Sequence, residues 1–434
     1  MKAPPPGSAD VAERPSRWRD RLGPGLITGA SDDDPSGIAT YAQAGTRFGF
    51  ELSWTLLLTY PLMVAVQAIS ARIGRTTGRG IAGNLRRHYP PWILQGTAVL
   101  LCLANATNIG ADLGAMAAAM RLLTRSLPAW VWVLAFGAGC TVAQILVPYN
   151  RYVSILKWLT LSLLAYVAVL FTVHVPWGAV LRGLVWPRWS GDAAFWQMVM
   201  AILGTTISPY LLFWQASQEA EDVREVRERQ PLKRTPWQAP AALARIRIDT
   251  AIGMGYSNLV ALSILVTTAA TLSHGGVREI TTAAQAAQAL RPVAGEFAFA
   301  VFALGIIGTG LLAVPVLAGS AAYALGEAFR WPVGLARTAL QAKSFYGTIA
   351  AMTLIGALAN AGSLNPISAL VWSAVLNGVV AVPVMGLLMV MAGDRRIMGT
   401  LTVSGPWMII GWLAAAVMAL AAVGMLVSAL PGGH

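Results

Sequence analysis

The stretch that decides the fold lies at residues 23–40 and reads GPGLITGASDDDPSGIAT. Three consecutive aspartates, a proline and several glycines interrupt an apolar run of about 20 residues, the length that spans a bilayer. Proline removes a backbone donor and clashes with the preceding helical turn, and Gly37 lowers the helix propensity further. Residues 202–210, which read ILGTTISPY, carry a second mid-run proline among small hydroxyl residues. We therefore predict two membrane helices that are each broken near the middle.

The composition excludes a soluble globular protein. Of the 434 residues, 56% are hydrophobic and 12% are charged, whereas an ordinary soluble protein carries about 25% charged residues. The 16 tryptophans lie among long apolar runs, which excludes disorder as well. The formal net charge of +12 is distributed between these runs, so it does not indicate nucleic-acid binding. The sequence predicts an all-α membrane protein with many spans.

Eleven apolar runs are predicted to be transmembrane helices within one transporter domain at residues 22–430. Their approximate ranges are 22–46, 51–72, 92–122, 130–148, 153–175, 194–217, 247–272, 295–325, 344–361, 366–392 and 404–430. With the polar tail at residues 1–21 in the cytosol, 24 of the 31 lysines and arginines fall on the inner side and seven on the outer side. Positive residues concentrate on the cytoplasmic side of a bacterial-type inner membrane. This distribution predicts a cytoplasmic N-terminus and an outside C-terminus.

The two broken spans occupy matching places in the chain. They begin two five-span halves, at about residues 22–175 and 194–392, and an extra helix follows at about 404–430. Interrupted helices at corresponding places are typical of inverted-repeat transporters, whose binding site lies near the bilayer midplane. A carboxylate at that depth costs about 2.5 kcal/mol or more on insertion scales, so the aspartates indicate a polar or cation-binding site. A second interpretation stays open, in which Asp32, Asp33 and Asp34 form a loop or cap the helix that begins near Pro35.

Several motifs resemble the Nramp family of divalent-metal transporters. They are GPG at 23–25, DPSGIAT at 34–40, QAG at 43–45, QAISARIG at 67–74, TGR at 77–79 and GADL at 110–113. The resemblance implies a LeuT-like fold of two inverted five-helix repeats plus one extra helix. It also implies a metal held by an Asp-Pro-Gly-Asn motif on span 1 and a Met-Pro-His motif on span 6.

This sequence departs from both motifs of the family. Asp34 matches the aspartate ligand, but Gly37 stands at the asparagine, Ser208 at the methionine and Tyr210 at the histidine. The sequence thus resembles a divergent branch of the family, near its magnesium-transporting relatives. Asp33 has no counterpart in the usual motif and adds negative charge. The predicted metal-site residues are Asp34, Ser31, Gly37, Thr205, Ser208 and Asp33, with Ser31 and Thr205 supplying carbonyl oxygens.

The residues predicted for a proton or ion pathway are Asp32, Asp112, Tyr210 and Asn105. Asp112 matches an acidic residue of the family, whereas two glutamates of its proton route are replaced by Ala115 and Asn105. A tyrosine has an ordinary pKa near 10 and stays protonated at neutral pH. We therefore expect proton coupling to be weak or absent, although crowding of the three aspartates leaves a substitute proton carrier open.

The sequence predicts a secondary transporter that works by alternating access, with magnesium or manganese as the preferred cation. Methionine favours soft metals, whereas the hydroxyl of Ser208 is a hard donor that suits magnesium. The alternative is a proton- or sodium-coupled symporter of a small organic solute, such as an amine or an amino acid. We find no motif of a membrane enzyme, and we predict no cofactor, no nucleic-acid partner and no obligate protein partner.

Other polar residues receive structural predictions. Asn258, Asn377 and Gln144 are expected to form interhelical hydrogen bonds. Asp249 and Glu327, near span ends, are expected at the membrane interface. The charged segment from residue 219 to residue 247 is expected to form a cytosolic amphipathic helix and loop that touches anionic lipid.

Overall fold

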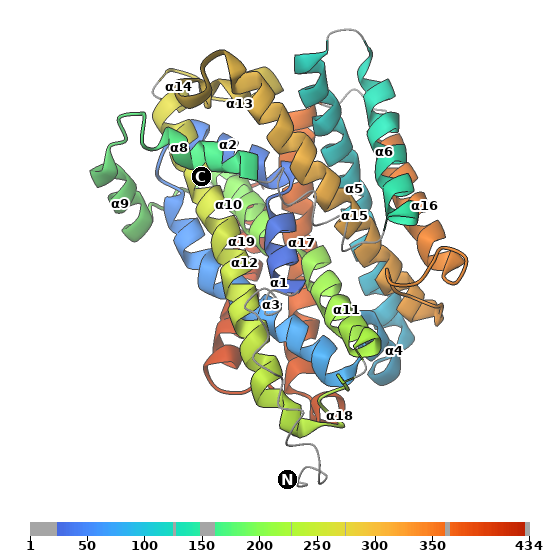
Figure 1. Cartoon of the computed structure of the whole chain (residues 1–434). Helices are drawn as coiled ribbons and strands as arrows, with labels where there is room; N and C mark the ends of the chain where they lie inside the picture. Colours follow the sequence, from blue (N-terminus) through green and yellow to red (C-terminus); the bar gives the residue numbers. More distant parts are fainter. Residues whose placement is uncertain are drawn as a thin grey trace.

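The computed structural model describes residues 24–124, 127–147, 161–226, 228–273, 275–360 and 365–429, which form helices joined by turns and contain no strand (Figure 1). The N-terminal half contains α1 (Pro24–Asp32), α2 (Pro35–Phe48), α3 (Ser53–Thr77), α4 (Ile81–His88), α5 (Pro91–Leu123), α6 (Ala129–Leu146), α8 (Leu164–Val169) and α9 (Trp177–Val185). The C-terminal half contains α10 (Ala193–Thr206), α11 (Pro209–Glu225), α12 (Ala239–Thr268), α13 (Ala283–Gln288), α14 (Arg291–Ala294), α15 (Ala298–Phe329), α16 (Lys343–Ala359), α17 (Pro366–Gly393), α18 (Arg395–Met398) and α19 (Pro406–Ser428).

Eight helical segments of the described residues are long and apolar enough to cross a membrane on their own. They coincide with eight of the eleven predicted spans. The predicted span at 22–46 is divided between α1 and α2, and the span at 344–361 is α16, which has 17 residues. The predicted span at 153–175 lies partly outside the described residues, and the tail at 1–21 lies wholly outside them.

Both predicted helix breaks are present. The first separates α1 from α2 at Asp33 and Asp34, and the second separates α10 from α11 at Ile207 and Ser208. Each second half-helix begins with a proline, Pro35 or Pro209. Proline is favoured at the first helical position because its missing N–H would have no intrahelical partner there. A proline at each break therefore prevents the first half-helix from continuing and begins the second half-helix.

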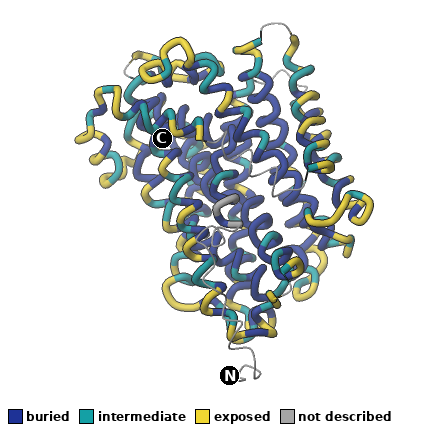
Figure 2. Tube along the Cα trace, viewed as in Figure 1, coloured by how far each residue is buried: buried dark blue, intermediate teal, exposed yellow. Residues whose placement is uncertain are grey.

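The core lies in the middle of the bundle, where the broken helices meet their neighbours (Figure 2). Small residues allow the backbones to approach closely, as is common between membrane helices. A Cβ atom on Gly29 of α1 would lie 2.2 Å from the carbonyl carbon of Gly253 in α12. A Cβ atom on Gly204 of α10 would lie 2.1 Å from the carbonyl oxygen of Ala374 in α17. These contacts hold one half of each broken helix against a continuous helix.

The prediction for residues 219–247 is wrong in its extent. Helix α11 continues to Glu225 and α12 already begins at Ala239, so much of the segment belongs to two long helices. The carboxylate of Glu219 is buried and pairs with Arg245 of α12, with 2.6 Å between nitrogen and oxygen. A paired charge is stable inside a protein. The charged residues therefore extend the bundle instead of forming a separate surface helix.

Candidate functional site

The side chain of Asp34 caps the second half of the first broken helix. Its Oδ1 atom accepts hydrogen bonds from Ser36 Oγ at 2.6 Å and from the backbone N–H of Gly37 at 2.8 Å. This arrangement is a helix N-cap, since the side chain satisfies a free N–H of the first turn. The capping interpretation of the aspartates is thus confirmed for Asp34. Capping does not exclude cation binding, because the second carboxylate oxygen points to the other broken helix.

Tyr210, in the first turn of α11, joins the two breaks. Its hydroxyl lies 3.2 Å from the carbonyl oxygen of Ser31 and 3.4 Å from Oδ2 of Asp34. The same Oδ2 atom accepts a hydrogen bond from Nδ2 of Asn108 in α5 at 2.9 Å. The predicted juxtaposition of the two breaks is therefore present, with a tyrosine between them where the family's histidine is expected.

Asp32 and Asp33 point toward α12 and share one partner there. The Ser257 hydroxyl lies 2.6 Å from Oδ2 of Asp32 and 3.0 Å from Oδ1 of Asp33. The remaining oxygen of each carboxylate is buried and has no hydrogen-bond partner among the described residues. Two acidic side chains thus reach the interior with half of their acceptor capacity unused.

Asp112 of α5 completes a group of four buried carboxylates. It lies four residues after Asn108, which places both side chains on the same face of α5. Neither oxygen of Asp112 has a side-chain hydrogen-bond partner among the described residues. The side chains of Asp32, Asp33, Asp34 and Asp112 belong to residues that are at most 2% exposed. We call these four residues the acidic group.

No positive side chain balances the acidic group within the described part of the chain. The ion pairs found there within 4 Å involve other carboxylates. The described residues also contain no group of three or more histidine, cysteine, aspartate or glutamate side chains arranged to hold a metal. A cation between the breaks would therefore need carbonyl, hydroxyl or amide oxygens beside the carboxylates.

The second break supplies such oxygens. Ser208 donates its hydroxyl to the carbonyl oxygens of Gly204 at 2.8 Å and Thr205 at 3.0 Å. Gly37 lies directly opposite, because a Cβ atom there would be 2.9 Å from Oγ1 of Thr205. The structure therefore brings the predicted residues Asp34, Gly37, Ser31, Thr205 and Ser208 together. Their role as metal ligands stays a prediction.

Asn105 and the three residues with predicted interhelical hydrogen bonds differ in their partners. Asn105 donates to the carbonyl oxygen of Leu317 and to Ser320 of α15, both at 2.8 Å. The predicted interhelical bond of Gln144 is wrong, since its side chain bonds to Cys140 in its own helix at 3.4 Å. The side-chain amide of Asn377 and the side-chain oxygen of Asn258 have no partner among the described residues.

Asp249 and Glu327, which were predicted at the membrane interface, each contact the start of another helix. Asp249 is buried and accepts a hydrogen bond from the backbone N–H of Gly25 at 2.7 Å. Glu327 is buried and accepts from Gly80 N at 2.7 Å and Gly83 N at 2.8 Å. Each carboxylate satisfies N–H groups at the start of another helix, which is a favourable position for a negative charge.

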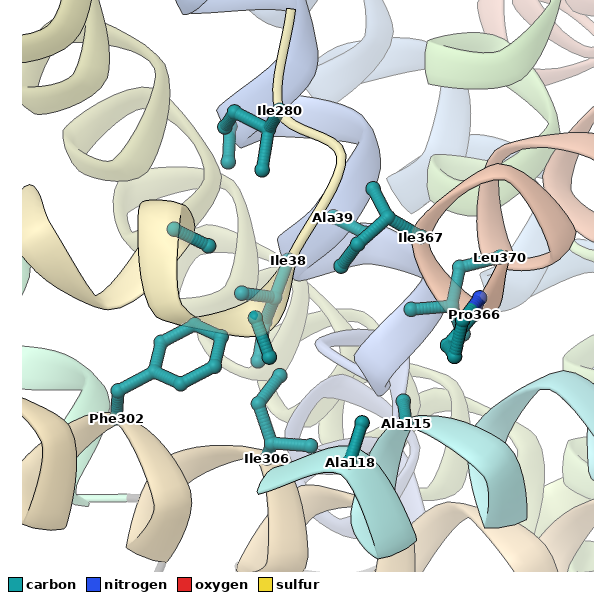
Figure 3. A pocket seen from close by; sticks show the side chains of 13 residues that line it. Ile38, Ala39, Ala115, Ala118, Ile280, Phe302, Ile306, Pro366, Ile367 and Leu370 are labelled. Atoms are coloured by element: carbon teal, nitrogen blue, oxygen red, sulfur yellow. The ribbon is translucent and has the colours of Figure 1, made fainter. Parts of the chain in front are cut away.

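Apolar side chains gather around a small cavity toward the α13 end of the bundle (Figure 3). A cavity of about 10 Å³, room for roughly one water molecule, is lined there only by apolar residues of α2, α5, α15, α17 and the α13 region. Ala115, at the position of a family glutamate, is among them. The lining includes Ile38, Ile280, Phe302, Ile306 and Ile367. The described residues that line this cavity offer no polar side chain on the way to the acidic group.

The sequence profile described as natural resistance-associated macrophage protein-like matches residues 25–428. The chain belongs to the Nramp family. As a member of that family with apolar helices of spanning length, it is an integral membrane protein.

The curated relatives of this Nramp protein include transporters of similar length. A divalent metal cation transporter MntH of Aeromonas hydrophila is 27% identical over 394 residues, covering 87% of this chain and 88% of the relative. The protein of the same name from Yersinia pestis is 26% identical over 422 residues, covering 94% of this chain and 95% of the relative.

Solved structures confirm the LeuT-like fold predicted for this Nramp protein. A manganese transporter of Eremococcus coleocola has a TM-score of 0.74 at 17% identity, covering 96% of this chain and 89% of that one. Mhp1, a nucleobase-cation-symport-1 family transporter, has a TM-score of 0.52 at 16% identity, covering 96% and 94%. At these identities the similarity concerns the fold alone.

Proposed function

We propose that the protein is a secondary transporter that moves divalent metal cations between its two broken helices by alternating access. The observation that carries the proposal is the acidic group, four buried carboxylates without a positive side chain among the described residues. Buried charge of one sign requires protons or a bound cation to be stable. The names of the MntH relatives agree with a cation as the substrate.

The donor types favour a hard cation, magnesium or manganese. Carboxylates, hydroxyls and carbonyl oxygens surround the breaks, and Ser208 stands where a thioether would select softer metals. Weak or absent proton coupling follows from Tyr210 and Ala115, which replace titratable residues of the family's route. The inner membrane, with a cytoplasmic N-terminus, is the location that the distribution of lysine and arginine favours.

An organic solute is the less favoured substrate. Carriers of this fold direct a half-helix N-terminus at the carboxylate of an amino acid. In this chain Asp34 caps that half-helix N-terminus through Gly37, so a second carboxylate would meet repulsion there.

The experiment is cation uptake into proteoliposomes that contain the purified full-length protein. Magnesium, manganese and cadmium are compared with and without a pH gradient. We expect uptake of magnesium or manganese. We expect Asp34→Asn to lower this uptake at least about tenfold, because the variant loses one charge-assisted interaction of about 1.5 kcal/mol or more. Glu279→Gln, an exposed acidic residue outside the acidic group, serves as the matched control and should leave uptake unchanged.

A pH-sensitive dye inside the vesicles measures coupling in the same experiment. We expect no stoichiometric acidification during uptake. Wild-type uptake by Asp34→Asn would refute the site, whereas acidification that disappears in Asp32→Asn or Asp33→Asn would refute the uncoupled mechanism and leave the site intact.

A further inference from the structure

Five arginines from distant parts of the chain surround one cavity at the end of the bundle that carries α4. The cavity has a volume of about 420 Å³. Its charged lining residues are Arg79, Arg86, Arg224, Arg330, Arg337 and Glu327. They come from the turn before α4, from α4 itself, from the end of α11, and from the end of α15 with the segment after it. We call this cavity the arginine pocket.

The positive charge of the arginine pocket is largely unbalanced. Glu327 is the one acidic residue in the lining, and its oxygens already accept the backbone N–H groups of Gly80 and Gly83. Arg224 lies 3.9 Å from Glu327, at the limit of an ion pair. Arg79, Arg330 and Arg337 have no carboxylate within 4 Å among the described residues. A single negative charge therefore faces five guanidinium groups.

Arg79 shows the electrostatic cost of this arrangement. Partial burial, together with the nearby Arg87 and Arg86, lowers the pKa of the Arg79 guanidinium below its usual value. Arginine remains charged in spite of such a shift, because its guanidinium group stays protonated in proteins. A bound anion would relieve the repulsion. The planar guanidinium group matches the oxygens of a phosphate with two parallel hydrogen bonds, which favours phosphate over a spherical anion.

An aromatic pair beside the pocket points to the membrane surface. Phe329, which is 62% exposed, stacks on Trp331 with ring centroids 5.0 Å apart. Trp331 also lines the arginine pocket, and Arg330 lies between the two aromatic residues in the chain. Aromatic side chains next to arginine are typical of the membrane–water interface, where lipid headgroups are within reach.

We propose that the arginine pocket binds a phosphate-bearing anion, of the kind present in the headgroup of an anionic phospholipid. The phosphate is held between the turn before α4, the end of α11 and the segment after α15. Because Arg224 belongs to α11, which begins at the second break, the bound anion ties that half-helix to α4 and α15. Binding at this site is independent of the transported cation, so it can be measured whether or not the proposed transport is correct.

Binding is tested on the purified full-length protein in a neutral detergent at constant ionic strength. Native mass spectrometry counts bound phosphatidylglycerol against phosphatidylcholine, and calorimetry titrates pyrophosphate as the soluble source of phosphate. The variants are Arg79→Gln with Arg330→Gln, and separately Arg330→Gln with Arg337→Gln. Arg395→Gln, an exposed arginine of α18 outside the lining, is the matched control.

We expect tighter binding of phosphatidylglycerol than of phosphatidylcholine, with the half-saturating concentration raised on the order of tenfold in the double variants and less than twofold in the control. Variant-sensitive binding of pyrophosphate alone would assign the site to a soluble phosphate compound. The proposal is overturned if neither probe binds in a way that the pocket variants weaken, or if Arg395→Gln weakens binding equally. Should Arg79→Gln prevent folding, the pair at Arg330 and Arg337 decides, because both side chains are exposed.

Discussion

The two ends of the helix bundle seal the acidic group with different chemistry. At the N-terminal end, the lower end in Figure 1, ion pairs and backbone hydrogen bonds link the half-helices to α12. Arg245 of α12 pairs with Glu219 and Asp222 of α11, at 2.6 Å and 3.7 Å, and Asp249 of α12 accepts from the first turn of α1. At the α13 end, the same closure depends on apolar side chains around a very small cavity.

This difference has consequences for how each end opens. Separating apolar surfaces costs roughly in proportion to the exposed area and leaves no charge unpaired. Separating a buried ion pair leaves carboxylates that must find water or protons, and the cost is concentrated in a few side chains. Single substitutions of charged residues should therefore lower the stability strongly at the N-terminal end. At the α13 end, the stability should depend on the size of the apolar side chains.

The largest effect is expected from Arg245→Gln. Glu219 is 1% exposed, so this change leaves its carboxylate buried without its partner. Loss of one member of a buried pair typically costs about 3–5 kcal/mol. The thermal unfolding midpoint of the purified protein in detergent should fall clearly, and Arg245→Gln with Glu219→Gln should recover more than half of the loss. A double variant no more stable than Arg245→Gln would show that the pair is not what holds α11 to α12.

The sequence predicts the helix breaks, but not which residues bond to one another at the N-terminal end. Pro35 and Pro209 identify both breaks correctly, because the effect of proline on a helix is local. By contrast, Asp249 bonds to Gly25 across 224 residues, and no local pattern indicates which distant N–H group a carboxylate will accept. For Asp249 and Glu327, the sequence indicated a place near the ends of spans but not the N–H groups that they accept.

The candidate site shows the same division. Asp34 was identified from its motif, and its capping role follows from its place before Pro35. Ser257 and Asn108 were missed, although they contact Asp32 and Asp34 directly. Asn108 has a usable signal, since it lies one helical turn before Asp112. Ser257 has none, because a single serine in an apolar helix is common wherever membrane helices pack closely.

A smaller effect is expected from Ile306→Ala at the α13 end. Ile306 is buried and lines the cavity of Figure 3, so truncation enlarges an apolar void without leaving a polar group unpaired. The expected loss is about 2 kcal/mol, near the lower end for an isoleucine truncation in a core. Thermal unfolding at low and high sodium chloride should give the same loss. Ile409→Ala, on the exposed face of α19, is the control and should change the midpoint little. A loss that depends on salt would contradict an apolar seal.

The smallest effect is expected from Glu51→Gln. This variant tests whether burial or ion pairing makes substitutions at the N-terminal end so destabilising. Glu51 pairs with Arg188 at 3.0 Å, but the two side chains are 46% and 63% exposed. Water already solvates both charges, so an exposed pair contributes only about 0–1 kcal/mol, and salt screens what remains. The unfolding midpoint should fall slightly at low salt and match that of the unmodified protein at high salt. A loss as large as that of Arg245→Gln would mean that pairing itself, whatever the burial, determines stability in this bundle. A small loss places the cause in the burial of Glu219, which is 1% exposed.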